Sequence, residues 1–344
     1  MKKFLIIQTA FLGDVILTLP LVQLLKKELP NSQIDFVAIP ETSQILKSHP
    51  DISRLIVYDK HGTQKSLLAF IRFKNELRKE RYDVVLCPHR SLRSCLLTKF
   101  SDTAIRIGFD NSAVKSCFTN LQPWSFGVHE VDRNLSLLKP LSAIGIQLSA
   151  SSKEMPKIFP AKENIEESER FLVENDVHAP FAVVAPGTTW KTKRYPVDMM
   201  AQVVKKVSGK FGAMVIVGGK KDLWMEKSVE GISRNTVSAI GKFSIMTSAE
   251  IIRRSSLVIA NDSAPVHIAS AFNVPTVAIF GPTVKDFGFY PYHDRSIVFE
   301  IDGLSCRPCS IHGGPRCPIG SFECMRRISP DEVVAKALEI LEKG

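Results

Sequence analysis

The sequence contains no run of about 18 uninterrupted apolar residues, the length that a membrane-spanning helix requires. Its first residues, MKKFLII, imitate the start of a signal peptide, but the apolar run is short and no A-x-A cleavage site follows it. We therefore interpret this stretch as a first β-strand and expect a cytoplasmic protein. Low-complexity tracts and short-period repeats are also missing, so nothing in the sequence indicates a repeat architecture.

Three motifs that would indicate other functions are missing as well. No G-x-G-x-x-G follows the first expected strand, so binding of a nicotinamide dinucleotide is unsupported. No aromatic-rich stacking motif accompanies the basic segments, which argues against a nucleic-acid partner. No D-x-D pair is present to hold Mg²⁺ between two phosphates, so we expect chemistry without a metal ion or a cofactor.

Positive charge, in contrast, is abundant. The net charge is +10 and the pI is about 9.2. Residues 71–119 hold ten Lys and Arg against five Asp and Glu, and such a surplus attracts phosphate groups on nucleic acid, anionic lipid or a small acidic substrate. A solvated helix face explains the charges at 70–83 well. It explains PHRSLRS at 88–94 less easily, because that run directly follows an apolar strand.

Short β-branched runs alternate with amphipathic helical patterns, which is typical of parallel α/β sheets. A length of 344 residues indicates two domains, and the aperiodic segment at 147–160 indicates the linker between them. We therefore predict an α/β protein with two Rossmann-like domains, 1–155 and 156–344, whose parallel sheets face an interdomain cleft. Ser329, Pro330 and Glu332 form a capping box for a C-terminal helix at 330–343, which could pack back on the first domain.

The predicted elements are numerous enough to fill both domains. In the first domain we expect strands at 3–8, 34–38, 55–57, 83–87 and 104–107, and helices at 14–28, 41–47, 64–80, 91–100 and 131–144. In the second domain we expect strands at 181–185, 213–217, 236–239, 257–260 and 276–280, and helices at 161–175, 197–210, 222–231, 247–254 and 264–272. Ligands of such sheets bind beyond the carboxyl ends of the strands, so the loops that follow strands are where chemistry is expected.

The first of these loops with unusual polar chemistry lies in AFLGDVILTLP, residues 10–20. One carboxylate, Asp14, stands between Gly13 and an aliphatic run and has no basic neighbour in sequence. An aspartate at a helix start can cap the orphan N–H groups of the first turn. A carboxylate at the carboxyl end of a strand can equally serve as a catalytic base, and the residues alone leave both roles open.

The second loop lies in VVAPGTTWKTKRYP, residues 183–196, where a strand breaks at Pro186 and Gly187. Hydroxyl and cationic side chains follow the break: Thr188, Thr189, Lys191, Lys193 and Arg194. This set suits a diphosphate through charge-assisted hydrogen bonds, and the simpler alternative is a basic surface turn.

The third loop lies in LVIANDSAPVHIASAFNVPTVAIFGPT, residues 257–283. Asp262 or Ser263 can cap the helix that begins at Ala264, and a helix N-terminus surrounded by small residues is an anion site. His267 lies in the first turns of this helix and can reach the same ligand or serve as a packing residue. The loop after the next strand adds Gly281 and Thr283 to the same rim.

These segments together resemble one family. FLGDVILTLP, PGTTWKTKRYP and NDSAPVHIASAFNVPTVAIFGPT are similar to the bacterial lipopolysaccharide heptosyltransferases, glycosyltransferase family 9, which have the GT-B fold. HPDISRLIVYD, PHRSLRS and RIGFD fit the same pattern, so the resemblance covers nearly the whole chain. Within the family it is strongest to the second heptosyltransferase of inner-core assembly.

The resemblance implies a reaction. It implies inverting transfer of L-glycero-D-manno-heptose from ADP-heptose to an acceptor of the heptosyl-Kdo2-lipid A type, with Asp14 as general base. It also implies where the donor binds: Thr188, Thr189 and Lys193 at its phosphates, and Asp262, Ser263, Ala264 and His267 in its nucleotide-sugar loop. Lys193 and the helix N-terminus before His267 would stabilise the leaving ADP.

The acceptor that the resemblance implies is anionic and sits at the cytoplasmic face of the inner membrane. We therefore assign Arg90 and Arg93 to acceptor binding and expect peripheral contact with that membrane. The chain departs from the family at one position: some relatives hold the donor ribose with a Glu where this chain reads VGGKKD. Lys220, Lys221 and Asp222 are the residues available there.

Other functions fit parts of the same sequence. A family 9 transferase for another ADP- or UDP-activated sugar or another core position fits the same motifs, and so does a nucleotide-sugar epimerase, which would act without an acceptor. A two-domain sugar-binding protein shares the bilobal plan, but such proteins are usually exported.

The cysteines are harder to interpret. Cys87, Cys95 and Cys117 are scattered, whereas Cys306, Cys309, Cys317 and Cys324 form C-x2-C-x7-C-x6-C in a Gly- and Pro-rich loop. A four-cysteine zinc site fits the leading C-x2-C, although the later spacings differ from common zinc ribbons. The alternatives for these cysteines are a disulfide and free thiols, and free thiols fit a reducing cytoplasm best.

Overall fold

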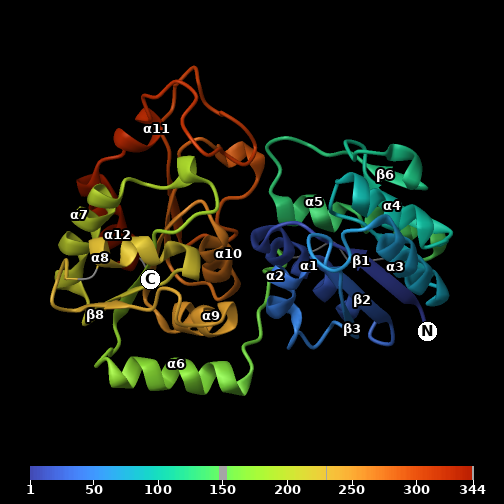
Figure 1. Ribbon diagram of the computed structural model, residues 1–344, viewed down its shortest axis with the longest axis horizontal. Helices are drawn as coiled ribbons and strands as arrows, with labels where there is room; N and C mark the ends of the chain where they lie inside the picture. The colour runs from blue at the N-terminus through green and yellow to red at the C-terminus, as the bar shows by residue number, and fades with distance from the viewer. Residues whose placement is uncertain (147–152, 230, 343–344) are drawn as a thin grey trace. The chain divides into compact units, whose positions relative to one another are not determined.

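The computed structural model describes residues 1–146, 153–229 and 231–342. The chain divides into two compact units, Met1–Phe159 and Pro160–Gly344, each with one six-stranded parallel sheet (Figure 1). The predicted α/β class is therefore confirmed. The division falls between Phe159 and Pro160, where we expected it between 155 and 156, and residues 147–152 of the predicted linker lie outside the described residues.

The sheet of unit 1 follows the prediction closely. Its strands, in spatial order, are β3 (Arg54–Val57), β2 (Gln33–Ala38), β1 (Lys3–Ile7), β4 (Val84–Leu86), β5 (Ile105–Phe109) and β6 (Asn120–Gln122). Its helices are α1 (Leu12–Glu28), α2 (Pro40–Ser43), α3 (Leu67–Lys79), α4 (Leu92–Phe100) and α5 (Glu130–Ser136). Edge strand β6 was not predicted. The single helix expected at 131–144 is wrong, because α5 ends at Ser136 and a 3₁₀ helix, Lys139–Ile144, follows with Pro140 in its first turn.

The sheet of unit 2 contains, in spatial order, β12 (Ser296–Phe299), β11 (Thr276–Ile279), β10 (Leu257–Asn261), β7 (Phe181–Ala185), β8 (Ala213–Ile216) and β9 (Thr236–Ser238). Its helices are α6 (Lys162–Glu174), α7 (Val197–Val207), α8 (Glu226–Val229), α9 (Ile245–Arg254), α10 (Ala264–Ala271), α11 (Glu323–Arg326) and α12 (Pro330–Glu342). Strand β12 was not predicted. The helix expected at 222–231 is instead a 3₁₀ helix, Lys220–Met225, followed by the short α8.

The two sheets share one strand order, and that order positions the functional loops. In each sheet the first and fourth strands of the unit are neighbours at the centre, β1 with β4 and β7 with β10. The second and third strands of the unit lie on one side of this pair, and the fifth and sixth lie on the other. Phe4 lies opposite Val84, and Leu257 lies opposite Ala182. The loops after these strands meet at the switch point, which is the ligand-binding place of doubly wound sheets.

Helix α12 belongs to the core of unit 2. The N–H of Asp331 donates to Ser329 Oγ over 3.2 Å, so Ser329 caps the helix as predicted. The apolar side of α12, with Val333, Ala337 and Ile340, is buried among residues of α7 and the second sheet. The sequence left open whether this helix packs back on the first domain, and in the structure its apolar side is buried within unit 2. Among the described helices, none combines the length and the apolar character that crossing a membrane requires.

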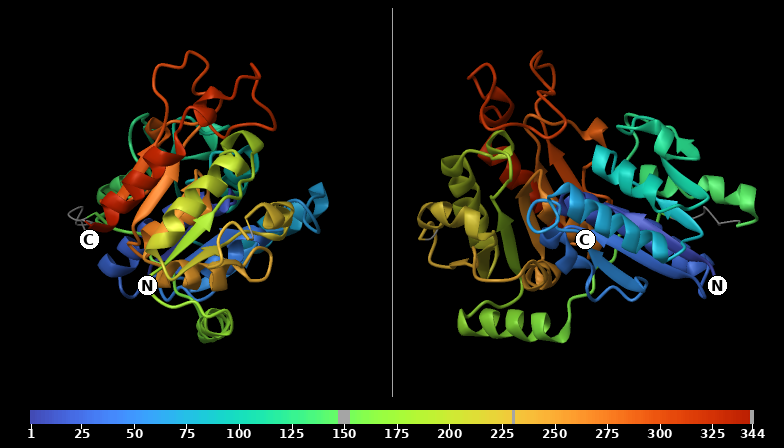
Figure 2. Two further views of the ribbon diagram at one scale, coloured as in Figure 1. Left: turned by 90° about the vertical axis from the view of Figure 1, so that its left-hand side faces the viewer. Right: turned by 45° about the vertical axis from the view of Figure 1, so that its right-hand side comes forward.

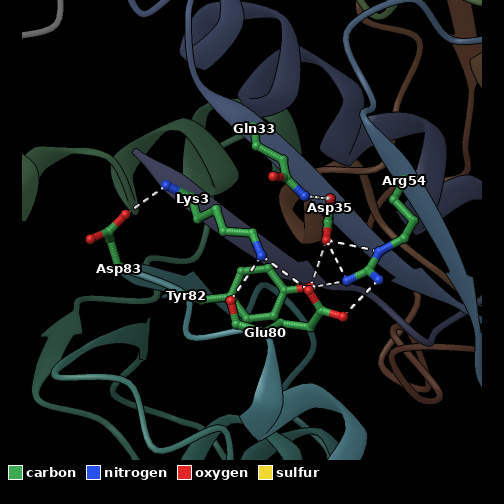
Figure 3. Close-up of polar contacts among 7 residues, drawn as sticks. All are labelled: Lys3, Gln33, Asp35, Arg54, Glu80, Tyr82 and Asp83. Atoms are coloured by element: carbon green, nitrogen blue, oxygen red, sulfur yellow. Dashed lines mark hydrogen bonds and ion pairs between the residues drawn. The ribbon is translucent and has the colours of Figure 1, made fainter. Parts of the chain in front are cut away.

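A polar network closes the amino-terminal edge of the first sheet (Figure 3). Asp35 on β2 is completely buried, and its carboxylate accepts hydrogen bonds from Arg54 Nη2 (2.8 Å) and Tyr82 Oη (2.7 Å). The guanidinium of Arg54 also donates to Glu80 over 2.8 Å. Because this network lies at the opposite edge from the loops after β1 and β4, its role is structural.

Replacing Arg54 with methionine is expected to lower the free energy of unfolding by about 2–3 kcal/mol, because the buried Asp35 carboxylate loses its cation. The matched control is Arg78→Met, which removes an ion pair with Asp102 (2.7 Å) whose two side chains are mostly exposed. That control is expected to cost less than about 1 kcal/mol. Urea unfolding of both variants checks the difference, and equal losses would contradict it.

Candidate active site

Asp14 occupies the first turn of α1, directly after the loop that follows β1. Phe11, and not Asp14, is the N-cap residue, and its side chain makes no capping hydrogen bond. The aspartate is therefore not held as an N-cap residue, although the backbone of Phe11 and of Asp14 itself hydrogen-bonds to its carboxylate. Asp14 as a whole residue is partly exposed, while its carboxyl group is buried among its neighbours.

The backbone around Asp14 is fixed by buried polar contacts. Thr18 Oγ1 donates to the Asp14 carbonyl over 2.8 Å, and Gln8 Nε2 donates to the same hydroxyl over 3.2 Å. Asn134, on α5, donates to the Leu17 carbonyl over 3.1 Å and so ties α5 to α1. The turn that carries the carboxylate is thereby held in place from the end of β1 and from α5.

The electrostatic surroundings of Asp14 raise its pKa to about 7. Burial of the carboxyl group is the main cause, and the negative charge of Glu130 acts in the same direction. The Arg90 guanidinium opposes this rise. A carboxyl group with a pKa near 7 is matched to proton transfer at neutral pH.

Glu130 and Trp124 are site residues that the sequence did not single out. Glu130 is buried at the start of α5, and its carboxylate accepts a hydrogen bond from Arg133 Nε over 2.8 Å. The Trp124 ring lies between two guanidinium groups, that of Arg90 at 4.8 Å and that of Arg133 at 4.5 Å from its centre. These cation–π contacts orient Arg90 beside the carboxylates of Asp14 and Glu130.

Arg90 and Arg93, both assigned to the acceptor from the sequence, have different surroundings. Arg90 acts electrostatically on Asp14 and Glu130. Arg93 instead donates to the carbonyls of Lys60 (3.0 Å) and Lys65 (2.8 Å), so its guanidinium holds the loop between β3 and α3. The structure thus brings only Arg90 to the Asp14 carboxylate.

His89 also belongs to this rim, one residue before Arg90. Its Nδ1 lies 3.0 Å from Thr9 Oγ1 and 2.9 Å from Ser94 Oγ. Burial, together with the nearby cations Lys60 and Arg90, lowers the pKa of His89 to about 3, so the ring is neutral at working pH. The signal in the sequence was its place in PHRSLRS, shortly after β4.

In unit 2, the structure brings together residues that follow three different strands. Lys193 Nζ lies 2.6 Å from Asp262 Oδ2, and Thr283 Oγ1 donates to the same oxygen over 2.6 Å. Asp262 is buried and Lys193 is mostly buried. Lys193 follows β7, Asp262 follows β10 and Thr283 follows β11, so the two contacts join the carboxyl ends of three adjacent strands.

Asn261 fixes the loop after β7. Its Nδ2 donates to the Pro186 carbonyl over 2.8 Å, and its Oδ1 accepts from the Tyr195 N–H over 3.1 Å. Thr188 Oγ1 donates to the Trp190 carbonyl over 2.8 Å, while Thr189 is exposed. The loop that carries Lys193 is therefore bound at both of its ends to the end of β10.

The helix after β10 begins as predicted. Ser263 is the N-cap residue of α10, but its hydroxyl donates to the Asn261 carbonyl (3.2 Å) and makes no capping bond to the helix. The first helical residue is Ala264, and Pro265 follows it. His267 is buried in the body of the helix.

Of Lys220, Lys221 and Asp222, the structure places Asp222 against the loop after β7. A Cβ at Gly187 would stand 2.4 Å from Asp222 Oδ2, so the glycine permits this close approach. The same oxygen accepts the Gly219 N–H over 2.9 Å. Lys220 and Lys221 are exposed.

The cysteines are free thiols in this structure. Cys324 is buried, and burial with the neighbouring thiols raises its pKa to about 11. Within the part of the chain that the structure describes, no three His, Cys, Asp or Glu side chains are grouped as metal ligands.

Solved structures with the same fold define the class. The glycosyltransferase family 9 protein of Veillonella parvula has a TM-score of 0.87 and 25% identity, over 100% of this chain and 98% of that one. The ADP-heptose LPS heptosyltransferase II of E. coli has a TM-score of 0.76 and 19% identity, over 100% and 99% of the two chains. The fold is therefore the two-domain α/β fold of the GT-B glycosyltransferases.

The family follows from the sequence profile described as glycosyltransferase family 9 (heptosyltransferase), which matches residues 70–314. This chain belongs to that family and is a glycosyltransferase. Its relatives include lipopolysaccharide heptosyltransferase 1 of Pseudomonas aeruginosa, 25% identical over 89% of this chain and 86% of the relative. They also include lipooligosaccharide heptosyltransferase 2 of Campylobacter jejuni, 23% identical over 100% and 99%.

Proposed function

We propose that this chain transfers L-glycero-D-manno-heptose from ADP-heptose to the inner core of lipopolysaccharide, with inversion at the anomeric carbon. Relatives named as lipopolysaccharide or lipooligosaccharide heptosyltransferases support the substrate class. A structural neighbour, E. coli heptosyltransferase WaaC, was solved with ADP and with ADP-2-deoxy-2-fluoro heptose. The observation that carries the proposal is the Asp14 carboxyl group at the switch point of unit 1, with its pKa raised to about 7.

In the proposed reaction Asp14 accepts the proton of the acceptor hydroxyl as that oxygen attacks the anomeric carbon. Inversion needs one base on the face opposite the leaving group, and Asp14, in the first turn of α1 after β1, is the carboxylate proposed for that role. The bond from the anomeric carbon to the ADP oxygen breaks as the new glycosidic bond forms. Glu130 and Arg90 adjust the basicity of Asp14 from opposite directions.

Unit 2 binds the donor in this proposal. Lys193 faces the diphosphate and stabilises the negative charge that develops on the leaving ADP, so no metal ion is required. Its ammonium has three donors, and the ion pair with Asp262 occupies only part of that capacity. Thr188, Thr189, Ser263, Ala264 and His267 complete the donor site, and Asp222 takes the ribose hydroxyls that a Glu takes in some relatives.

Acceptor binding is assigned to unit 1. Arg90 contacts the anionic sugars or phosphates of a heptosyl-Kdo2-lipid A type acceptor near Asp14. Arg93 contributes through the β3–α3 loop whose carbonyls it holds. We assign the acceptor of the second heptosyltransferase of inner-core assembly to this site. The alternative is an acceptor at another core position, and the transfer assay below distinguishes the two.

The pH dependence of the reaction follows from the raised pKa of Asp14. The ionised form is the base, so kcat/KM is expected to rise with pH and to reach half of its plateau near pH 7. Removing a nearby negative charge lowers the pKa, so Glu130→Gln moves this limb to lower pH. Arg90→Gln removes a positive charge and moves it to higher pH. Initial rates of the parent and the two variants from pH 5 to 9 check both shifts. A pH profile of kcat/KM that is unchanged in both variants would contradict the assignment of Asp14 as the base.

Transfer assays test the function directly. The purified chain is given a panel of ADP- and UDP-sugars with defined truncated lipid A acceptors, in Mg²⁺ or in EDTA. We expect transfer from ADP-heptose in both buffers, with ADP release that depends on the acceptor. ADP or UDP release without any acceptor would favour an epimerase. Transfer of another sugar would show that the donor is not ADP-heptose.

A further inference from the structure

We propose that one outward face of unit 1 docks on an anionic lipid bilayer. The face is formed by Leu67, Leu68 and Ile71 of α3 with Leu92 and Phe100 of α4, and we call it the α3–α4 face. Helices α3 and α4 lie side by side in unit 1 (Figures 1 and 2). The inference rests on the proposed function only for the claim that the acceptor is lipid-linked.

The apolar exposure of this face is high. Leu67 is 73% exposed, Leu68 is 69% exposed and Leu92 is 54% exposed. The inner side of α3 is buried, because Phe70, Phe73 and Leu77 pack in the core of unit 1. A helix with one buried apolar side normally has polar residues on the other side. The exposed leucines of α3 therefore indicate a surface that binds a partner.

Contacts between the two helices fix them beside each other. The Phe100 ring lies 6.5 Å from the Phe70 ring, and Lys74 Nζ lies 4.3 Å from the centre of the Phe100 ring. At the other end, Arg93 Nη2 donates to the Lys65 carbonyl just before α3. The starts of α3 and α4 are therefore adjacent, and so are the middle of α3 and the end of α4.

The charge of the surrounding residues selects the kind of partner. Exposed or half-exposed cations border the face: Lys65, Arg72, Lys74, Lys79 and Lys99. Glu76 is the one acid on α3, and the acid Asp102 is engaged by Arg78. Cations near an anionic bilayer strengthen binding to it, and apolar side chains that enter the headgroup region add to this. A second copy of the chain would instead bring these cations together, which is unfavourable.

The position of the face suits a lipid-linked acceptor. Helix α3 begins at the carboxyl edge of the first sheet, the edge at which Asp14 lies. Lys60, in the loop before α3, donates to the Thr9 carbonyl over 2.6 Å, and Arg93 donates to the Lys60 carbonyl over 3.0 Å. Leu67 and Leu68 are thus attached through one ordered loop to the rim that holds the proposed base.

Vesicle co-sedimentation of the full chain tests the proposal, without donor or acceptor. We expect binding to vesicles of phosphatidylcholine with phosphatidylglycerol, weaker binding in high salt, and little binding to phosphatidylcholine alone. The double variant Leu67→Ser with Leu68→Ser is expected to bind at least about ten-fold more weakly. The control Val173→Ser, which removes a 74% exposed valine of α6 in unit 2, is expected to bind as the parent does.

Two results would overturn the proposal. One is binding that the double variant leaves unchanged. The other is absence of vesicle binding by the parent; if the parent then forms a dimer that the double variant dissociates, a second copy is the occupant. The proposed function is judged separately: the double variant should keep the parent's rate on a deacylated soluble acceptor and lose rate on the same acceptor in vesicles. Absence of transfer by the parent on both would contradict the function and leave the vesicle result standing.

Discussion

Replacing Asp14 with asparagine is expected to lower kcat by about 10²–10⁴-fold, the usual contribution of a general base. The amide keeps the shape of the side chain and cannot accept the proton of the acceptor hydroxyl. Affinity for ADP-heptose should change little, because the proposed donor residues all belong to unit 2. Initial rates with saturating acceptor, together with calorimetric titration of ADP, separate the two quantities.

A purely structural role for Asp14 predicts the opposite pattern. An acid in the first helical turn that only interacts with the helix dipole contributes about 0.3–1 kcal/mol to stability and nothing to kcat. The raised pKa means that ionising Asp14 is unfavourable in the folded chain, so its charge costs stability as the pH rises through about 7. The Asn variant should therefore gain stability relative to the parent at pH 8 while it loses turnover. A less stable variant with unchanged kcat would contradict the assignment.

Most of the fold could be predicted because hydrophobic periodicity is a local signal. The central strands β1, β7 and β10 are apolar on both faces and stand out as continuous runs. The missed strands are both at sheet edges: Asn120–Gln122 has no apolar pattern, and Ser296–Phe299 is only half buried. Their pairing depends on the sheet edge that the rest of the fold provides, so the local sequence does not reveal it.

The candidate site was partly predictable for a similar reason. Residues in the segments that follow strands, such as Asp14, Lys193 and Asp262, could be predicted from the pattern of strands and loops. The contact of Lys193 with Asp262 could not, because it depends on β7 and β10 being neighbours. Glu130 was missed because it begins a helix far from any predicted strand end, and only the packing of α5 on α1 brings it near Asp14.

Replacing Lys193 with methionine is expected to lower kcat by about 10²–10³-fold, the range seen when one group that stabilises developing charge is lost. Methionine keeps the length and most of the apolar stem, so the lost element is the positive charge facing the leaving diphosphate. ADP affinity should fall as well. Lys191→Met is the matched control, since Lys191 lies in the same short 3₁₀ helix and its side chain is exposed. Its kinetics should stay close to those of the parent.

A double variant distinguishes catalysis from structure at this position. In Lys193→Met the buried Asp262 carboxylate loses its cation and keeps only the hydrogen bond from Thr283. A buried charge without its partner is unfavourable, so the single variant should also lose stability. Adding Asp262→Asn removes the unpaired charge and should restore most of that stability. If Lys193 stabilises the leaving group, turnover stays low in the stable double variant. If turnover returns together with stability, Lys193 acts only by neutralising Asp262, and its role at the diphosphate is wrong.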